Sequence, residues 1–187
     1  ETVDRATQLA NQMLALAKVE QLRQQADLQP ADLTATLRAV ALDLAPLIAE
    51  KELEFDIETV PAMVNAHEWM LGELCRNLLH NAIKNSDTGG ALTVRIVTDT
   101  RYLALTISDS GPGISTELAT RLFQPFSAGN VRHGSGLGLA ICREITAALG
   151  GSISLENRMH PGQAGRVAGL DATVRLPLIA VKDENSA

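Results

Sequence analysis

The sequence predicts an α+β fold, a two-layer sandwich of helices packed on a sheet. Some segments repeat apolar residues every three or four positions, as amphipathic helices do, and others alternate apolar with polar residues, as strands do. The strands are joined mainly by hairpins, an order that favours a sandwich over a doubly wound parallel sheet. A chain of 187 residues is expected to form one domain with an appendage.

The first helix is expected to run to about Gln25. Its apolar residues recur at spacings of three and four and form one stripe: Val3, Ala6, Leu9, Ala10, Met13, Leu16, Ala17 and Leu22. Such a stripe requires a partner, either another helix or the core of the following domain. The pattern is already under way at Glu1, which suggests a fragment of a longer protein.

A break at Asp27–Pro30 precedes a second helix, which Asp32 is expected to cap and which reaches Glu50. Pro46 is expected to bend this helix or to mark a weak turn. The apolar residues expected to face the core are Leu33, Leu37, Val40, Leu44 and Leu47.

The remaining elements follow from the same two periodicities. Helices are predicted at Glu68–Asn85 and at Leu137–Leu149, the latter ending at Gly150-Gly151. Strands are predicted at Leu53–Val60, Met63–Val64, Ala91–Thr98, Tyr102–Asp109, Ser152–Glu156 and Leu170–Leu178. A glycine-rich loop is expected at His160–Gly169, and Asp99-Thr100 is expected to turn a hairpin.

Composition excludes several classes of function. A net charge of −6 without a basic cluster argues against nucleic-acid binding, which depends on Lys and Arg neutralising phosphates. Cys75 and Cys142 lie in apolar helical contexts, which favours buried thiols in a reducing compartment over a disulfide. No apolar run approaches the roughly 20 residues that cross a bilayer, so this segment is not expected to be membrane-embedded.

One side of the helix at Glu68–Asn85 is polar. Glu73, Asn77, Asn81 and Lys84 fall within about 80° of one another around the helix axis. A solvated helix face would explain this pattern. Two asparagines in register are less usual there, however, because Asn is a poor helix former and its oxygen suits a hard cation.

An acidic residue ends an otherwise apolar strand face. Leu103, Leu105, Ile107 and Asp109 share that face by two-residue alternation. A buried carboxylate needs hydrogen-bond donors, because an unpaired buried charge is costly. Capping of the turn into Gly111-Pro-Gly113 is the simpler role for this carboxylate.

A glycine cluster opens the last predicted helix and is formed by Gly134, Ser135, Gly136, Leu137 and Gly138. Free amides at a helix N-terminus attract anions such as phosphate, although a plain helix-opening turn would look similar. Neither a Rossmann nor a Walker motif fits, since no strand precedes the cluster and no Gly-Lys-Ser/Thr follows. The stretch Gln124–His133 is typical of a mobile lid, with Phe123 and Phe126 at its hinge and Arg132 able to close on phosphates.

In their order and spacing, these motifs together with Phe123-Gln-Pro-Phe126 resemble the nucleotide-binding domain of sensor histidine kinases, in the GHKL group of ATP-binding proteins. The resemblance covers roughly residues 28–178. It implies a Bergerat-type sandwich with a mixed, mostly antiparallel sheet, preceded by a helix. Residues 1–27 are then the C-terminal part of a dimerising helical hairpin, residues 28–180 the catalytic domain and residues 181–187 a tail.

The resemblance also implies roles for single residues. Asp109 accepts a hydrogen bond from the adenine amino group, while Gly111 and Gly113 let the backbone approach the base. Asn81 ligates Mg2+ on the ATP phosphates, Asn77 lines the same site, and Lys84 offsets phosphate charge. Glu73 is the catalytic residue that orients or deprotonates the attacking group. Further nucleotide contacts come from Arg132, Gly134, Ser135, Gly136, Leu137 and Gly138.

The function implied is transfer of the ATP γ-phosphoryl group to a histidine that this segment lacks, for relay to the receiver domain of a response regulator. The intact protein would be a homodimer through its hairpin, with this domain on the cytoplasmic side of a bacterial inner membrane. Asn85 stands where relatives often carry an aromatic residue, and the lid is short. A nucleotide-binding scaffold therefore stays open as an alternative, as does a GHKL ATPase or a serine kinase of the anti-sigma type.

Overall fold

The computed structural model describes residues 2–25, 28–119, 121–125, 137–162 and 165–179. Five helices lie in these ranges: α1 (Thr2–Gln25), α2 (Leu33–Glu50), α3 (Glu68–Asn85), α4 (Thr116–Ala119) and α5 (Gly138–Ala148). The strands there are β1 (Gln29–Asp32), β2 (Glu54–Glu58), β3 (Met63–Ala66), β4 (Ala91–Thr98), β5 (Tyr102–Ser108), β6 (Ser152–Met159) and β7 (Val167–Pro177).

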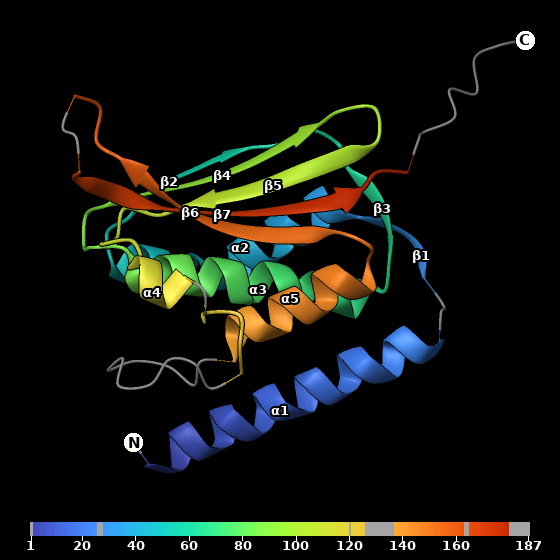
Figure 1. Cartoon of the computed structure of the whole chain (residues 1–187). Helices are drawn as coiled ribbons and strands as arrows, with labels where there is room; N and C mark the ends of the chain where they lie inside the picture. The colour runs from blue at the N-terminus through green and yellow to red at the C-terminus, as the bar shows by residue number, and fades with distance from the viewer. Residues whose placement is uncertain (1, 26–27, 120, 126–136, 163–164, 180–187) are drawn as a thin grey trace, which may run out of the picture.

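Five strands form one sheet in the order β2-β4-β5-β7-β6. Only β2 and β4 run parallel, while the other neighbouring pairs are antiparallel. Helices α2, α3 and α5 cover one face of this sheet, and α1 lies beyond them on the side away from the sheet (Figure 1). The predicted α+β sandwich with a mixed, mostly antiparallel sheet is confirmed.

The core lies between the sheet and the three covering helices. Strand residues that point toward the helices are almost fully buried, because alternation puts every second side chain on that face; they include Leu92, Val94, Ile96, Leu103, Leu105, Ile107, Val174 and Leu176. Cys75 and Cys142 are also buried, as free thiols, and burial raises the pKa of Cys75 to about 12. The prediction of buried thiols without a disulfide is confirmed.

Helix α2 begins as predicted and differs in one core residue. The Asp32 side chain accepts a hydrogen bond from the Ala35 amide at 3.0 Å, and the helix continues through Pro46. The prediction that Leu47 faces the core is wrong, since its side chain is 37% exposed while Ile48 is buried. Steps of three and four residues from Leu37 lead to Ile48, which stands directly above the preceding buried turns.

The sequence prediction missed two short elements, β1 and α4, and made β6 and β7 too short at the ends that face each other along the chain. Strand β1 overlaps the break that was expected at Asp27–Pro30, and it pairs antiparallel with β3 as a separate two-stranded sheet. Strand β7 begins at Val167, inside the segment His160–Gly169 that was predicted as a loop, and β6 continues to Met159, three residues beyond its predicted end at Glu156. Backbone pairing with a neighbouring strand overrides the local preference of polar and glycine residues for loops.

Helix α1 packs against α5 and the start of α3. Ala15 and Val19 are buried in this contact, and the Lys18 ammonium lies 4.3 Å from the centre of the Trp69 ring. The predicted stripe is only partly right, because Met13 is 54% exposed. In the described part of the chain, no helix combines the length and hydrophobicity needed to span a bilayer.

Replacing Gly72 with Ala is expected to stabilise the fold by about 0.5–1 kcal/mol, because glycine is a poor helix former. Gly72 lies inside α3, and an added Cβ would have no atom within 4 Å other than those of its own helix. Urea unfolding of both proteins measures the change. A loss of stability would show that this position cannot accept a methyl group.

Candidate functional site

The polar side of α3 is half-buried and internally bonded. Asn77 Nδ2 donates to the Glu73 carboxylate at 3.0 Å and to the Glu73 carbonyl oxygen at 2.8 Å. Asn77 therefore presents its amide oxygen rather than its nitrogen to its surroundings. This arrangement departs from a freely solvated helix face, on which such side chains would extend into water.

The start of α5 lies against this side of α3. A Cβ built on Gly138 would stand 3.0 Å from Asn77 Oδ1 and 3.5 Å from Asn81 Nδ2. Further along, Cys142 Sγ lies 4.0 Å from the Leu74 carbonyl oxygen, so the two helices run antiparallel. Leu137, immediately before α5, is fully buried and anchors its first turn. The predicted glycine motif thus ends beside the two asparagines.

Asp109 follows β5 and is only 5% exposed. Its Oδ1 accepts hydrogen bonds from the Gly111 amide at 2.9 Å and the Leu170 amide at 3.2 Å. Burial raises the pKa of this carboxyl, while the two amide bonds and the Arg158 charge oppose that rise. A buried carboxylate held by backbone donors at a strand end is the arrangement that the sequence analysis anticipated.

The two glycines after Asp109 fit close to other backbone. A Cβ on Gly111 would collide with the Asn85 carbonyl oxygen, so this turn lies against the last residue of α3. Gly113 has φ of +73°, and a Cβ there would collide with the Asn157 side chain. The Asp109 turn and the start of α5 therefore both meet the C-terminal half of α3, which brings the predicted motifs together.

Lys84 lies near the C-terminus of α3, and partial burial lowers its pKa. The carbonyl oxygens of Lys84 and Ser86 each accept a hydrogen bond from Lys51 Nζ at 2.7 Å. A lysine from the end of α2 thus satisfies carbonyls that a helix end leaves unpaired. The sequence analysis missed Lys51, which no motif marks.

Four predicted site residues lie outside the described residues: Arg132, Gly134, Ser135 and Gly136. Most of the predicted lid, Gln124–His133, also lies outside the described residues, and so does Phe126. Phe123, at the other end of the Phe-Gln-Pro-Phe motif, is described and half-buried.

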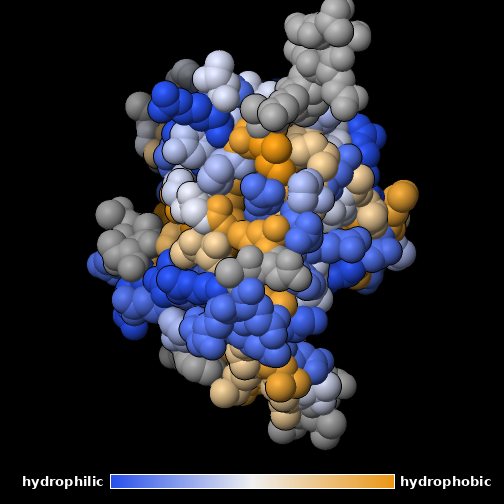
Figure 2. Space-filling model, turned by 90° about the vertical axis from the view of Figure 1, so that its right-hand side faces the viewer, coloured by the Kyte–Doolittle hydropathy of each residue, from blue (hydrophilic) through white to orange (hydrophobic). Residues whose placement is uncertain are grey.

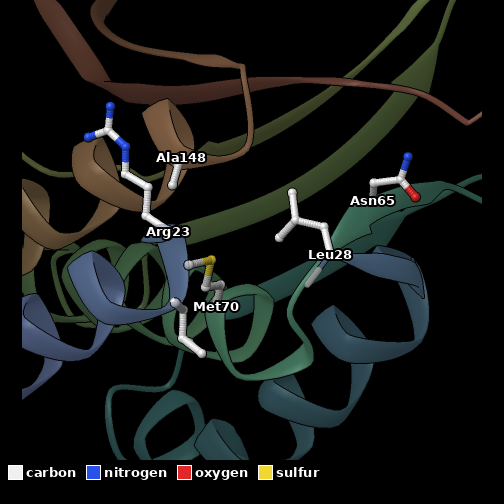
Figure 3. A pocket seen from close by; sticks show the side chains of 6 residues that line it. Arg23, Leu28, Asn65, Met70 and Ala148 are labelled. Carbon is white, nitrogen blue, oxygen red and sulfur yellow. The ribbon is translucent and has the colours of Figure 1, made fainter. Parts of the chain in front are cut away.

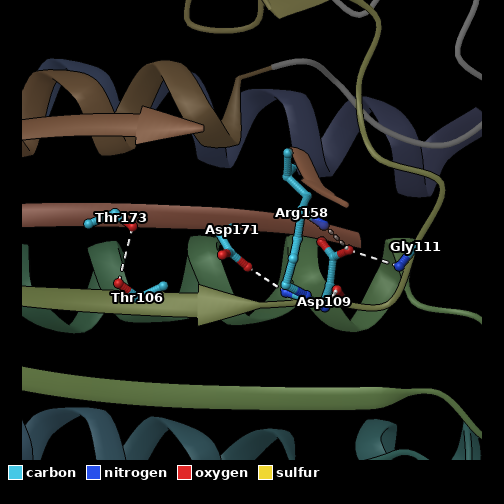
Figure 4. A network of polar contacts seen from close by, with 7 residues as sticks. Thr106, Asp109, Gly111, Arg158, Asp171 and Thr173 are labelled. Atoms are coloured by element: carbon cyan, nitrogen blue, oxygen red, sulfur yellow. Dashed lines mark hydrogen bonds and ion pairs between the residues drawn. The ribbon is translucent and has the colours of Figure 1, made fainter. Parts of the chain in front are cut away.

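A group of polar residues near Asp109 was also missed (Figure 4). Arg158 of β6 donates to the Asp109 carbonyl oxygen at 2.8 Å and pairs with Asp171 of β7. A Cβ on Gly169 of β7 would collide with that same carbonyl oxygen. A glycine within a strand signals close backbone approach, and Gly169 was the clue available in the sequence.

A separate hollow of about 390 Å³ lies where α1, β3, α3 and α5 converge, and its lining includes Arg23, Asn65, Met70 and Ala148 (Figure 3). Met70 lies in the first turn of α3 and Ala148 ends α5, so this hollow lies at the opposite end of the helix pair from Asn81 and Gly138. Figure 2 shows that the face at this end carries hydrophobic patches broken by polar side chains.

Comparison with known proteins points to one family. A family profile described as "Histidine kinase-, DNA gyrase B-, and HSP90-like ATPase" matches residues 66–180. The sensor histidine kinase RcsC of Escherichia coli K12 is 32% identical over 180 residues, which are 91% of this chain and 18% of that protein. The sensor protein QseC of Salmonella typhi is 30% identical over 169 residues, which are 86% of this chain and 36% of that protein. The chain thus spans about a fifth to a third of the length of these relatives.

Solved structures agree with the sequence comparison. The mycobacterial sensor histidine kinase MprB superposes with a TM-score of 0.70 at 29% identity, covering 81% of this chain and 97% of that structure. The catalytic domain of the histidine kinase ThkA gives 0.71 at 27% identity, with coverages of 81% and 95%. Membership of an ATPase family implies the use of ATP. From its sequence and its fold, the chain belongs to the family of histidine kinase-, DNA gyrase B- and HSP90-like ATPases.

Proposed function

We propose that this chain is the ATP-binding catalytic domain of a two-component sensor histidine kinase, which transfers the ATP γ-phosphoryl group to a histidine on another segment. One observation carries the proposal: the half-buried asparagines of α3, Gly138 of α5 and the buried Asp109 meet around one end of α3. The sensor kinases among its relatives support the same function.

In this proposal Asp109 selects the base. Its carboxylate accepts a hydrogen bond from the adenine amino group, and the backbone at Gly111 and Gly113 lies against the ring. Guanine carries a carbonyl oxygen at the corresponding position, which would face the carboxylate without a proton to share. The site therefore favours ATP over GTP.

The phosphates and Mg2+ would lie beside the polar side of α3. In the described residues no three His, Cys, Asp or Glu side chains gather as a metal cage. The side-chain oxygens of two asparagines are a donor set that fits Mg2+, because proteins commonly hold this ion by one or two oxygens together with water and substrate phosphates. We assign the Asn81 side-chain oxygen as the protein ligand, with Asn77 lining the site. Bound Mg2+ would neutralise charge on the phosphates.

Charged groups would complete the phosphate site. Lys84 offsets phosphate charge, and the backbone from Gly134 through Ser135, Gly136 and Leu137 to Gly138 contributes amide donors at the start of α5. Arg132 adds a charge-assisted hydrogen bond. Transfer would then depend on positioning and electrostatic stabilisation more than on covalent chemistry.

Glu73 is proposed as the catalytic residue that orients or deprotonates the accepting histidine. The Asn77 amide holds its carboxylate at 3.0 Å, which fixes its direction relative to Asn81, one turn beyond Asn77. The bond also leaves the second carboxylate oxygen of Glu73 available to an incoming group.

The surroundings of the domain belong to the same proposal. Residues 1–27 would be the C-terminal part of a dimerising helical hairpin, residues 28–180 the catalytic domain and residues 181–187 a tail. The intact protein would be a homodimer anchored in a bacterial inner membrane, with this domain in the cytoplasm. The phosphoryl group would pass from the histidine to an aspartate on a response regulator receiver domain.

Two measurements test the proposal. Calorimetry with ATP and Mg2+ should detect binding, and Asn81→Ala should reduce it to the level of wild type without Mg2+. Labelled ATP should then phosphorylate a supplied dimerisation hairpin on histidine, and Glu73→Gln should slow transfer without weakening binding. Binding without transfer would favour a scaffold. Phosphate released to water or placed on serine would favour the other GHKL activities.

ATP affinity is also expected to fall as pH decreases, and this fall should begin at a higher pH than the ordinary pKa of an aspartate would predict. Burial raises the pKa of Asp109, and the protonated carboxyl would turn a donor toward the adenine amino group. The pKa of Asp109 is higher in the folded state than in the unfolded state. The free energy of unfolding is therefore expected to decrease as pH rises from the unfolded-state pKa to the folded-state pKa. Calorimetry with ATP and with purine riboside triphosphate, whose phosphates titrate alike, isolates the carboxyl. Equal pH profiles for both ligands would contradict the assignment.

A further inference from the structure

Two consecutive residues of β6 hold the loop that follows β5. Arg158 donates through Nη2 to the Asp109 carbonyl oxygen at 2.8 Å. Asn157 accepts from the Ile114 amide at 2.8 Å and donates to the Ile114 carbonyl oxygen at 2.7 Å. Both ends of the segment 109–114 are therefore tied to one strand that lies more than forty residues away in the sequence.

The Arg158 guanidinium is itself held in place. Its Nη1 pairs with the Asp171 carboxylate on β7 (Figure 4), and both side chains are half-buried. A planar guanidinium can make two such bonds at once in a fixed geometry, whereas a lysine ammonium is a single flexible point charge. Asp171 thus fixes the nitrogen that reaches the Asp109 backbone.

We propose that Asn157 and Arg158 act as a brace that positions the segment 109–114, and with it the Asp109 carboxylate, for recognition of adenine. The inference rests on the function proposed above, because it assumes that Asp109 faces the base. The two brace residues do not touch the nucleotide and are positioning residues. Their effect is expected on base recognition more than on phosphate binding.

The geometry gives a reason for this selectivity. A hydrogen bond weakens steeply when its angle departs from linearity, so a small rotation of the Asp109 backbone misaligns the carboxylate with the amino group. The asparagines of α3 and Gly138 lie on other elements and make no described contact with the brace. Substitution of Asn157 or Arg158 should therefore leave the contacts with the phosphates intact.

The test compares two nucleotides on two arginine variants. Arg158→Gln should weaken ATP binding about tenfold, the cost of misaligning one charge-assisted hydrogen bond. Purine riboside triphosphate lacks the amino group, so its affinity should stay within about twofold of wild type. Arg95→Gln is the matched control, because Arg95 lies on β4, three strands away from β6 in the sheet, and pairs with the exposed Glu58. Both ligands should bind this control as they bind wild type.

Companion variants keep the result interpretable. Asn157→Ala should show the same loss for ATP alone, since it frees the other end of the segment. Arg158→Lys retains the charge and serves if the glutamine variant does not fold; it should also lose ATP affinity, because one ammonium cannot reproduce the planar fork. Thermal unfolding of each variant checks that the fold persists.

The outcomes separate the two proposals. A wild type that does not bind ATP, or does not prefer it to purine riboside triphosphate, would refute the proposed function. A wild type with that preference, combined with variants that lose both ligands equally or lose neither, would refute the brace and leave the proposed function intact.

Discussion

Asp109→Asn is expected to weaken ATP binding about a hundredfold, or roughly 3 kcal/mol. The variant keeps the size of the side chain and one oxygen, which still accepts from the Gly111 and Leu170 amides. The other oxygen becomes an amino group that faces the amino group of adenine. Two donors then meet in a buried place, and each loses a partner that water would otherwise supply.

The same exchange predicts a change in base preference. The new amide can donate to the carbonyl oxygen of guanine, so the difference between ATP and GTP affinities should narrow or reverse. Asp56→Asn is the matched control, because Asp56 is exposed on the edge strand β2 and the substitution removes the same charge. Calorimetry with both nucleotides measures the result. An unchanged ATP affinity in the Asp109 variant would remove this residue from the site.

The prediction from sequence succeeded where a single element carried enough periodicity. The bounds of α3 and β4 agree with the structure because long runs of three-to-four or two-residue spacing lie between clear breaks. Strand β1 offered no such run: its four residues, Gln29–Asp32, include a proline, and it exists because β3 pairs with it. Pairing partners far away in the sequence leave little local pattern.

The candidate site divides in the same way. Glu73, Asn77 and Asn81 were placed together because one helix sets their spacing, and Asp109 was placed at a strand end by alternation. The contact of Arg158 with Asp109 depends on the register of β6 on β7 and of β7 on β5. A shift of one residue in either register would turn those side chains to the other face, and no motif specifies it.

Gly169→Ala is expected to cost about 3 kcal/mol of folding stability and to weaken ATP binding with it. The position combines two constraints. Its φ of +155° is one that residues with a Cβ rarely adopt, and the added methyl group would collide with the carbonyl oxygen of Asp109 and approach Arg158 Nη2 at 2.8 Å. Strand β7 would have to move away from the end of β5, at the residue proposed to bind adenine.

Gly165→Ala separates the collision from the backbone strain. Gly165 precedes β7, also has positive φ (+84°), and a Cβ there would have no atom within 4 Å. Its substitution should cost only the left-handed conformation, about 1 kcal/mol, and leave ATP affinity unchanged. Urea unfolding and calorimetry on both variants measure the two effects. Equal losses of stability would mean that strain alone acts at Gly169 and that β7 does not press on the Asp109 backbone. A larger loss at Gly169, with ATP affinity reduced there alone, is the result expected if close packing of β7 against Asp109 shapes the site.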